Sequence, residues 1–156
     1  MNTFTKWFLL NAVMVTSIFF AETKGAISLM VSSDVSYLTI VIMSLYVIVS
    51  GMVGGLCYLS DKIRKGREKD ARRHLSKRAE VGWFAAEHFF SLGLLGTVIG
   101  LCMSTATSLN DEASVSGMVA GLKVGLNTAF YTTICGIVFS LPLQVQLMIL
   151  RFKLEE

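Results

Sequence analysis

Four long apolar blocks, separated by shorter polar segments, dominate the sequence. They cover about residues 4–30, 35–59, 83–109 and 118–150. Apolar residues fill each block without alternating or following one helical face, which is typical of helices buried all round. About 20 apolar residues in a helix cross a bilayer. The pattern therefore predicts an all-α membrane protein in which four transmembrane helices form a single membrane domain over residues 1–156.

The charged residues are few and unevenly placed. They make up 16% of the chain, against about a quarter in ordinary soluble domains. The connection 60–82 holds most of the cations, namely Lys62, Arg64, Lys65, Arg67, Lys69, Arg72, Arg73, Lys77 and Arg78. Short loops rich in Lys and Arg stay in the cytoplasm. This rule predicts that both termini are cytoplasmic as well.

The basic connection does not indicate nucleic-acid binding, because no aromatic interleaving or recognition motif accompanies it. Its usual meaning is orientation in the membrane and contact with anionic lipid. The sequence also shows no nucleophile–base pair and no metal-ligand spacing. We therefore expect neither an enzyme nor a metal or cofactor site.

Small and polar residues form a stripe on each of the last two spans, at steps of three or four residues that keep them on one helical face. The third span carries Gly93, Thr97, Gly100, Ser104 and Thr107, with Gly96 forming a GxxxG pair with Gly100. The fourth carries Gly121, Gly125, Ala129, Thr132, Gly136 and Ser140. Such stripes usually mark close packing between membrane helices, so the glycines are predicted packing residues.

The depth of the threonines suggests more than packing. Thr97 lies about fourteen residues, roughly 21 Å, from the cytoplasmic end of its span. Thr132 and Thr133 lie about fifteen residues from the outer end of the next span. Polar groups are costly at such depth. We predict an ion pathway formed by these three hydroxyls, flanked by Thr128 and Ser104.

No Asp or Glu lies near the middle of any span. Since hydroxyls do not titrate, this chain alone lacks a central carboxylate. Glu87 and His88 either line the cytoplasmic mouth of the pathway or extend to the membrane interface. Lys123 either guards the outer entrance or extends outward. Pro142 is a predicted hinge in the fourth span.

Two stretches resemble the MotA/TolQ/ExbB ion-channel subunits. They are LGLLGTVIG in the third span and GLNTAFYTTICGIVFSLP in the fourth. Thr97 stands where the family has its span-three threonine. Thr133, Gly136 and Pro142 match the family's closing pattern.

The resemblance implies a ring-shaped homopentamer in the bacterial inner membrane, with the long third and fourth helices lining its pore. Two copies of a single-span partner, each with an intramembrane aspartate, would occupy the centre. Proton or sodium flow would drive mechanical work. The Thr132–Thr133 pairing resembles sodium-driven stators, whereas the wider family is mostly proton-coupled. The short cytoplasmic connection lacks the torque-transmitting region of flagellar stators and favours a reduced envelope motor.

The residues alone also allow a different class of function. The chain would then be a passive four-helix membrane scaffold whose small-residue stripes only pack.

Overall fold

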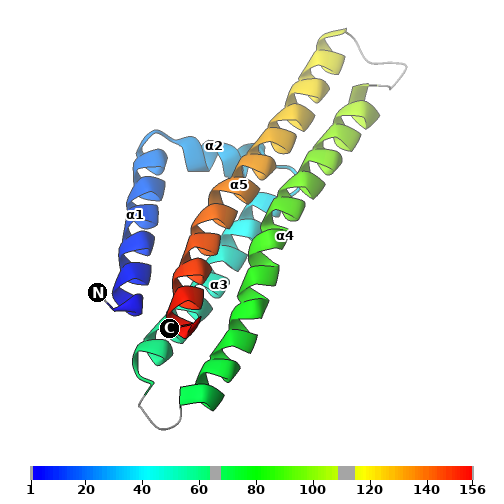
Figure 1. Cartoon of the computed structure of the whole chain (residues 1–156). Helices are drawn as coiled ribbons and strands as arrows, with labels where there is room; N and C mark the ends of the chain where they lie inside the picture. Colours follow the sequence, from blue (N-terminus) through cyan, green and yellow to red (C-terminus); the bar gives the residue numbers. More distant parts are fainter. Residues whose placement is uncertain (1, 64–67, 109–114, 156) are drawn as a thin grey trace.

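The computed structural model describes residues 2–63, 68–108 and 115–155. Within them the chain forms five α-helices and no strand (Figure 1). The helices are α1 (Thr3–Thr23), α2 (Ala26–Ser33), α3 (Leu38–Asp61), α4 (Glu68–Ser108) and α5 (Val115–Glu155). All except α2 are long and apolar enough to cross a membrane, as the sequence pattern predicts.

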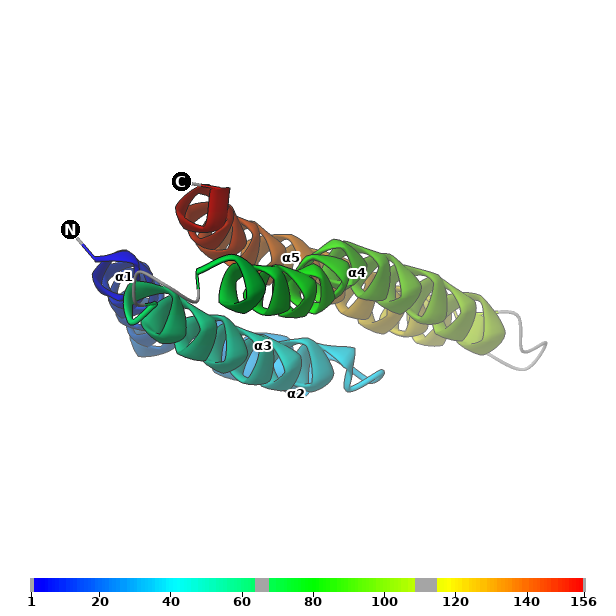
Figure 2. The ribbon, with the colours of Figure 1, turned by 60° about the horizontal axis from the view of Figure 1, so that its bottom comes forward.

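The two longest helices, α4 and α5, run antiparallel and pack along their length (Figure 1). Each has 41 residues, or about 61 Å. Figure 2 shows α1, α2 and α3 along one side of α4 and α5. The termini lie at the same end of the molecule, and α4 and α5 project beyond α3 at the opposite end (Figure 1).

The first predicted span, 4–30, is too long. The structure ends α1 at Thr23, because Lys24 and Gly25 donate their N–H groups to carbonyls of the last turn and Gly25 adopts a left-handed φ of 70°. The Glu22 carboxylate then accepts hydrogen bonds from the N–H and hydroxyl of Ser28. As a result, α2 turns across the end of the bundle toward α3 (Figure 1).

The charged segment after α3 is mostly helical. Within the predicted connection 60–82, α4 begins at Glu68 and runs without a break into the third apolar block. The fourth span is also longer than predicted and extends from Val115 to Glu155.

Two carboxylates from neighbouring segments cap helices. Asp61, the last residue of α3, accepts hydrogen bonds from the N–H groups of Thr3 and Phe4 in α1, at 3.1 and 2.9 Å. Asp34 accepts from the Ser36 and Thr39 N–H groups at 2.9 and 2.7 Å, where α3 begins. A carboxylate at a helix N-terminus satisfies free N–H groups and complements the helix dipole.

Glycines bring α4 and α5 into backbone contact. A Cβ added at Gly136 would lie 2.7 Å from the Phe89 carbonyl oxygen, and one added at Gly100 would lie 2.5 Å from the Gly125 carbonyl oxygen. A Cβ added at Gly93 would lie 3.0 Å from the Thr132 carbonyl oxygen and 3.2 Å from the Thr133 Cα atom. The two stripes seen in the sequence therefore face each other within one chain.

We expect Gly136→Ala to lower stability by about 1–3 kcal/mol, because the added methyl group meets backbone that cannot move aside cheaply. Gly55→Ala is the control, since a Cβ there meets no atom within 4 Å. Thermal unfolding in mild detergent measures both. Equal midpoints for the two variants would contradict the packing described here.

Acidification should weaken the start of α3. Burial raises the pKa of the Asp34 carboxyl, but hydrogen bonds from Ser36 and Thr39 outweigh it and leave the pKa below its ordinary 3.8. A lowered pKa contributes stability that is present above about pH 4 and lost as the pH falls through the folded-state value. The unfolding midpoint of Asp34→Asn should therefore fall less between pH 7 and pH 3 than that of the native chain.

Candidate functional site

The Thr97 and Thr133 side chains meet between α4 and α5, with their hydroxyl oxygens 2.5 Å apart. We call them the threonine pair. The Thr97 hydroxyl is 3.2 Å from the carbonyl oxygens of both Gly93 and Ala129. The Thr133 hydroxyl is 3.0 Å from the Ala129 oxygen and 3.4 Å from the Gly93 oxygen. Four oxygens from two helices thus gather at one point.

The threonine pair has more acceptors than protons. Each hydroxyl carries one proton and can accept two hydrogen bonds, so the two protons cannot satisfy every short contact at once. Both side chains are half-buried. Each hydroxyl hydrogen can therefore turn from one acceptor to another, and the hydroxyl oxygens have lone pairs that can accept a hydrogen bond from an approaching water molecule.

The pair lies closer to one end of α3 than to its middle. Thr128, which contacts Ser33 and Val35 at the corner between α2 and α3, is five residues or about 8 Å from Thr133 along α5. Within α5 (Val115–Glu155), Thr133 lies near the middle, where counting from the sequence placed it. The offset from the middle of α3 arises because α4 and α5 project beyond α3 at this end.

Thr132 does not join the threonine pair. It is fully buried, its hydroxyl donates to the Thr128 carbonyl oxygen at 2.9 Å, and its side chain occupies the space opposite Gly96. Adjacent residues on a helix point about 100° apart, so Thr132 and Thr133 share a level but face different neighbours.

The two flanking hydroxyls also lie elsewhere. The Thr128 hydroxyl donates to the Ser33 carbonyl oxygen at 3.1 Å and accepts from the Val35 N–H at 3.3 Å. Ser104 is buried beside Gly125. Gly121, one of the predicted packing glycines, is half-buried on α5. The side chain of Thr107 lies outside the described residues.

The predicted mouth residues do not contact the threonine pair. Glu87 and His88 are exposed on α4, and the His88 ring stacks on Phe84 with its Nδ1 atom 2.7 Å from the Phe84 carbonyl oxygen. Lys123 is exposed on the projecting part of α5. Pro142 is half-buried inside α5, which continues through it. Among the described residues, no group of three His, Cys, Asp or Glu could hold a metal ion.

Comparison with known proteins identifies the part of the chain that holds the threonine pair. Residues 59–156 match the MotA/TolQ/ExbB proton channel family. The chain belongs to this family. The match covers α4, α5 and the end of α3, and it confirms the resemblance found in the two sequence motifs. Neither the curated proteins nor the solved structures gave a significant match.

The helices outside the family match are joined to α5 by a polar cluster that sequence analysis missed. We call it the Gln146 cluster. The Trp7 Nε1–H donates to the Gln146 side-chain oxygen and to the Ser50 carbonyl oxygen, both at 3.1 Å. The Ser50 hydroxyl lies 2.9 Å from Asn11 Oδ1 and 3.0 Å from Gln146 Oε1. Gln146 Nε2 donates to the Tyr46 hydroxyl at 3.3 Å.

The Gln146 cluster gives α1 and α3 polar contacts with α5, although both helices also carry exposed apolar side chains. Asn11 and Gln146 are amides inside apolar blocks, and Tyr46 and Ser50 share a helical face. Polar residues inside membrane helices usually face a partner, so these amides were the available signal. Through them α1, α3 and the channel-family helix α5 are connected.

Replacing Gln146 with Leu should lower stability by about 1–3 kcal/mol, since Trp7, Ser50 and Tyr46 each lose one of their hydrogen-bond partners at a buried side chain. Gln144→Leu is the matched control, because that amide donates only to the Ser140 hydroxyl nearby on the same helix. Hydrogen–deuterium exchange of α1 should rise only in the first variant. Equal exchange in both would show that the cluster does not hold α1.

Proposed function

We propose that the chain is an ion-conducting subunit of a membrane energy transducer, with α4 and α5 lining the ion path. The observation that carries this proposal is the threonine pair. Its four oxygens lie on the two helices that match the channel family. Oxygens of this kind can orient water or hold a cation at a depth where polar groups are otherwise rare.

The hydrogen-bond partners that the structure describes for the threonine pair are backbone carbonyls and the two hydroxyls themselves. None of these groups binds and releases a proton near neutral pH. We therefore propose that a partner supplies the titrating group, as an aspartate on a single membrane helix. Two such helices inside a ring of five copies of this chain would place the aspartate beside each pair in turn, and ion flow would then be converted into mechanical work.

We propose protons as the transported ion, with sodium as the alternative. The sequence argument for sodium depends on the Thr132–Thr133 pairing, in which the Thr132 hydroxyl would supply an extra oxygen to the cation. That hydroxyl donates instead to the Thr128 carbonyl oxygen of its own helix. The family is described as a proton channel family. A sodium dependence of flux would favour the alternative.

The basic start of α4 and both termini lie at one end of the molecule. We propose that this end faces the cytoplasm of a bacterium, across its inner membrane. The projecting ends of α4 and α5 then face outward.

We expect Thr97→Ala and Thr133→Ala to reduce proton flux to the leak of empty vesicles while the complex still assembles. The complex is purified through a tag on this chain and reconstituted with a pH-sensitive dye inside the vesicles. Thr105→Ala is the control, since this exposed hydroxyl bonds only to its own helix. Full flux in both pair variants would refute the proposed path.

The passive scaffold is the second candidate, favoured by glycine contacts that already lie within one chain. It predicts that Thr97→Val and Thr133→Val are tolerated, while Gly96→Leu and Gly125→Leu disrupt the fold. A native complex without measurable flux would support it.

A further inference from the structure

A basic groove lies between the first turns of α4 and the last turns of α5, at the end that holds both termini. It encloses about 620 Å³, within the range of about 300–1,000 Å³ typical of ligand pockets. Its charged lining consists of Arg72, Arg73, Lys77, Arg151, Glu80 and Glu155. Four cations therefore face two carboxylates, and the groove carries an excess of positive charge.

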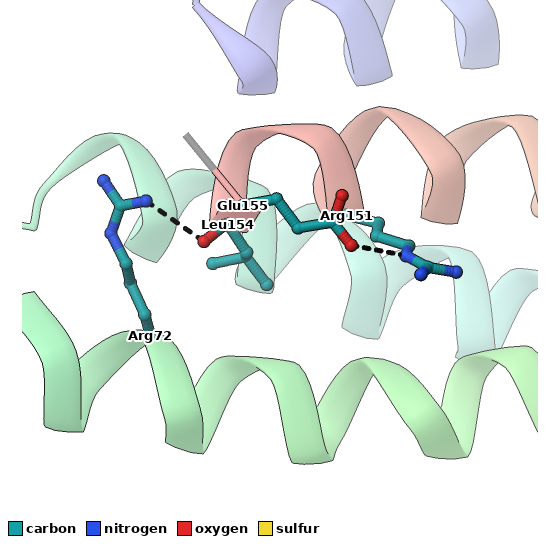
Figure 3. Close-up of polar contacts among 4 residues, drawn as sticks. All are labelled: Arg72, Arg151, Leu154 and Glu155. Carbon is teal, nitrogen blue, oxygen red and sulfur yellow. Dashed lines mark hydrogen bonds and ion pairs between the residues drawn. The ribbon is translucent and has the colours of Figure 1, made fainter.

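Three of the charged residues that line the groove already have a partner within the chain. Arg72 donates to the Leu154 carbonyl oxygen at 3.0 Å, which ties α4 to the end of α5 (Figure 3). Arg151 and Glu155 form an ion pair at 2.7 Å on α5 (Figure 3). These contacts shape the wall of the groove and neutralise one of its two carboxylates.

The other two cations have no such partner. Among the described residues, no hydrogen bond or ion pair is found for Arg73 or Lys77, which lie four residues apart on α4 and both line the groove. Like charges at this spacing repel each other. Asp70 and His74 lie beside them on the same helix without forming an ion pair with them. An anion between the two side chains would remove the repulsion.

The groove also has an apolar side. Trp83 lines it about one turn beyond Glu80, and Ala79 and Leu154 complete its apolar lining. Tryptophan is enriched where membrane helices meet the headgroup layer. A free phosphate ion would use only the cationic side, whereas a phospholipid would use both.

We propose that the basic groove binds one anionic phospholipid, with its phosphate between Arg73 and Lys77 and its acyl chains running past Trp83. The charge excess, the two unpaired cations and the adjoining apolar wall together carry this assignment. It requires only that the chain crosses a membrane. Its failure is therefore distinguishable from a failure of ion conduction.

The test counts lipids on the full-length protein by native mass spectrometry, with phosphatidylglycerol or phosphatidylcholine added. The Arg73→Gln, Lys77→Gln double variant should bind phosphatidylglycerol about tenfold more weakly, and phosphatidylcholine as before. The matched control is the Lys62→Gln, Arg78→Gln double variant. It removes the same charge from the same region, but Lys62 lies over Tyr58 and Arg78 lies beside α3, both outside the groove.

Two results would overturn the proposal. Equal losses in both double variants would show that the basic region acts as a diffuse charged surface, and unchanged binding in the groove variant would show that the lipid sits elsewhere. A second measurement, of thermal unfolding, separates lipid from free phosphate. Phosphatidylglycerol should raise the thermal unfolding midpoint in detergent, and inorganic phosphate at the same concentration should not. A rise with inorganic phosphate alone would assign the groove to a soluble anion.

Discussion

The close approach of α4 to α5 is the constraint on which the site depends. Where Gly93, Gly100 and Gly136 stand, the backbone of one helix touches that of the other. Larger side chains there would separate the helices, and the hydroxyls of Thr97 and Thr133 could no longer meet. In a bilayer there is little hydrophobic gain from helix association, so such contacts rely on packing and hydrogen bonds. The same glycines thus determine both the packing and the chemistry of this interface.

The spans and the two stripes are readable from the sequence because each depends on local pattern. Apolar length predicts a membrane helix, and spacing predicts which small residues share a face. The direction in which a single side chain points is harder to predict from the sequence. Thr132 and Thr133 are neighbours of the same type, yet only Thr133 reaches Thr97, because rotation about the helix axis depends on how α4 packs.

Tertiary hydrogen bonding accounts for the remaining differences between the sequence predictions and the structure. The break after α1 depends on the left-handed Gly25 and on the Glu22 carboxylate that receives α2. Within an apolar block, one glycine is an ambiguous signal. The Gln146 cluster is assembled from three helices far apart in the sequence. Its amide positions are visible in the sequence, but their pairing depends on the fold. The family match covers the final two helices and the end of α3, so it includes Gln146 but not the side chains from α1 and most of α3 that meet it.

The position of Ser50 between two amide oxygens gives the attachment of α1 a particular property. Its hydroxyl is 2.9 Å from Asn11 and 3.0 Å from Gln146, and it has a single proton to share. The proton can point to either oxygen with no movement of heavy atoms, so the two contacts are alternatives for a single donor. When α1 shifts away, the hydroxyl turns toward α5 and stays satisfied. Displacement of α1 would therefore leave the Ser50 hydroxyl paired with α5, whereas the Tyr46 hydroxyl on α3 would lose Asn11 as an acceptor.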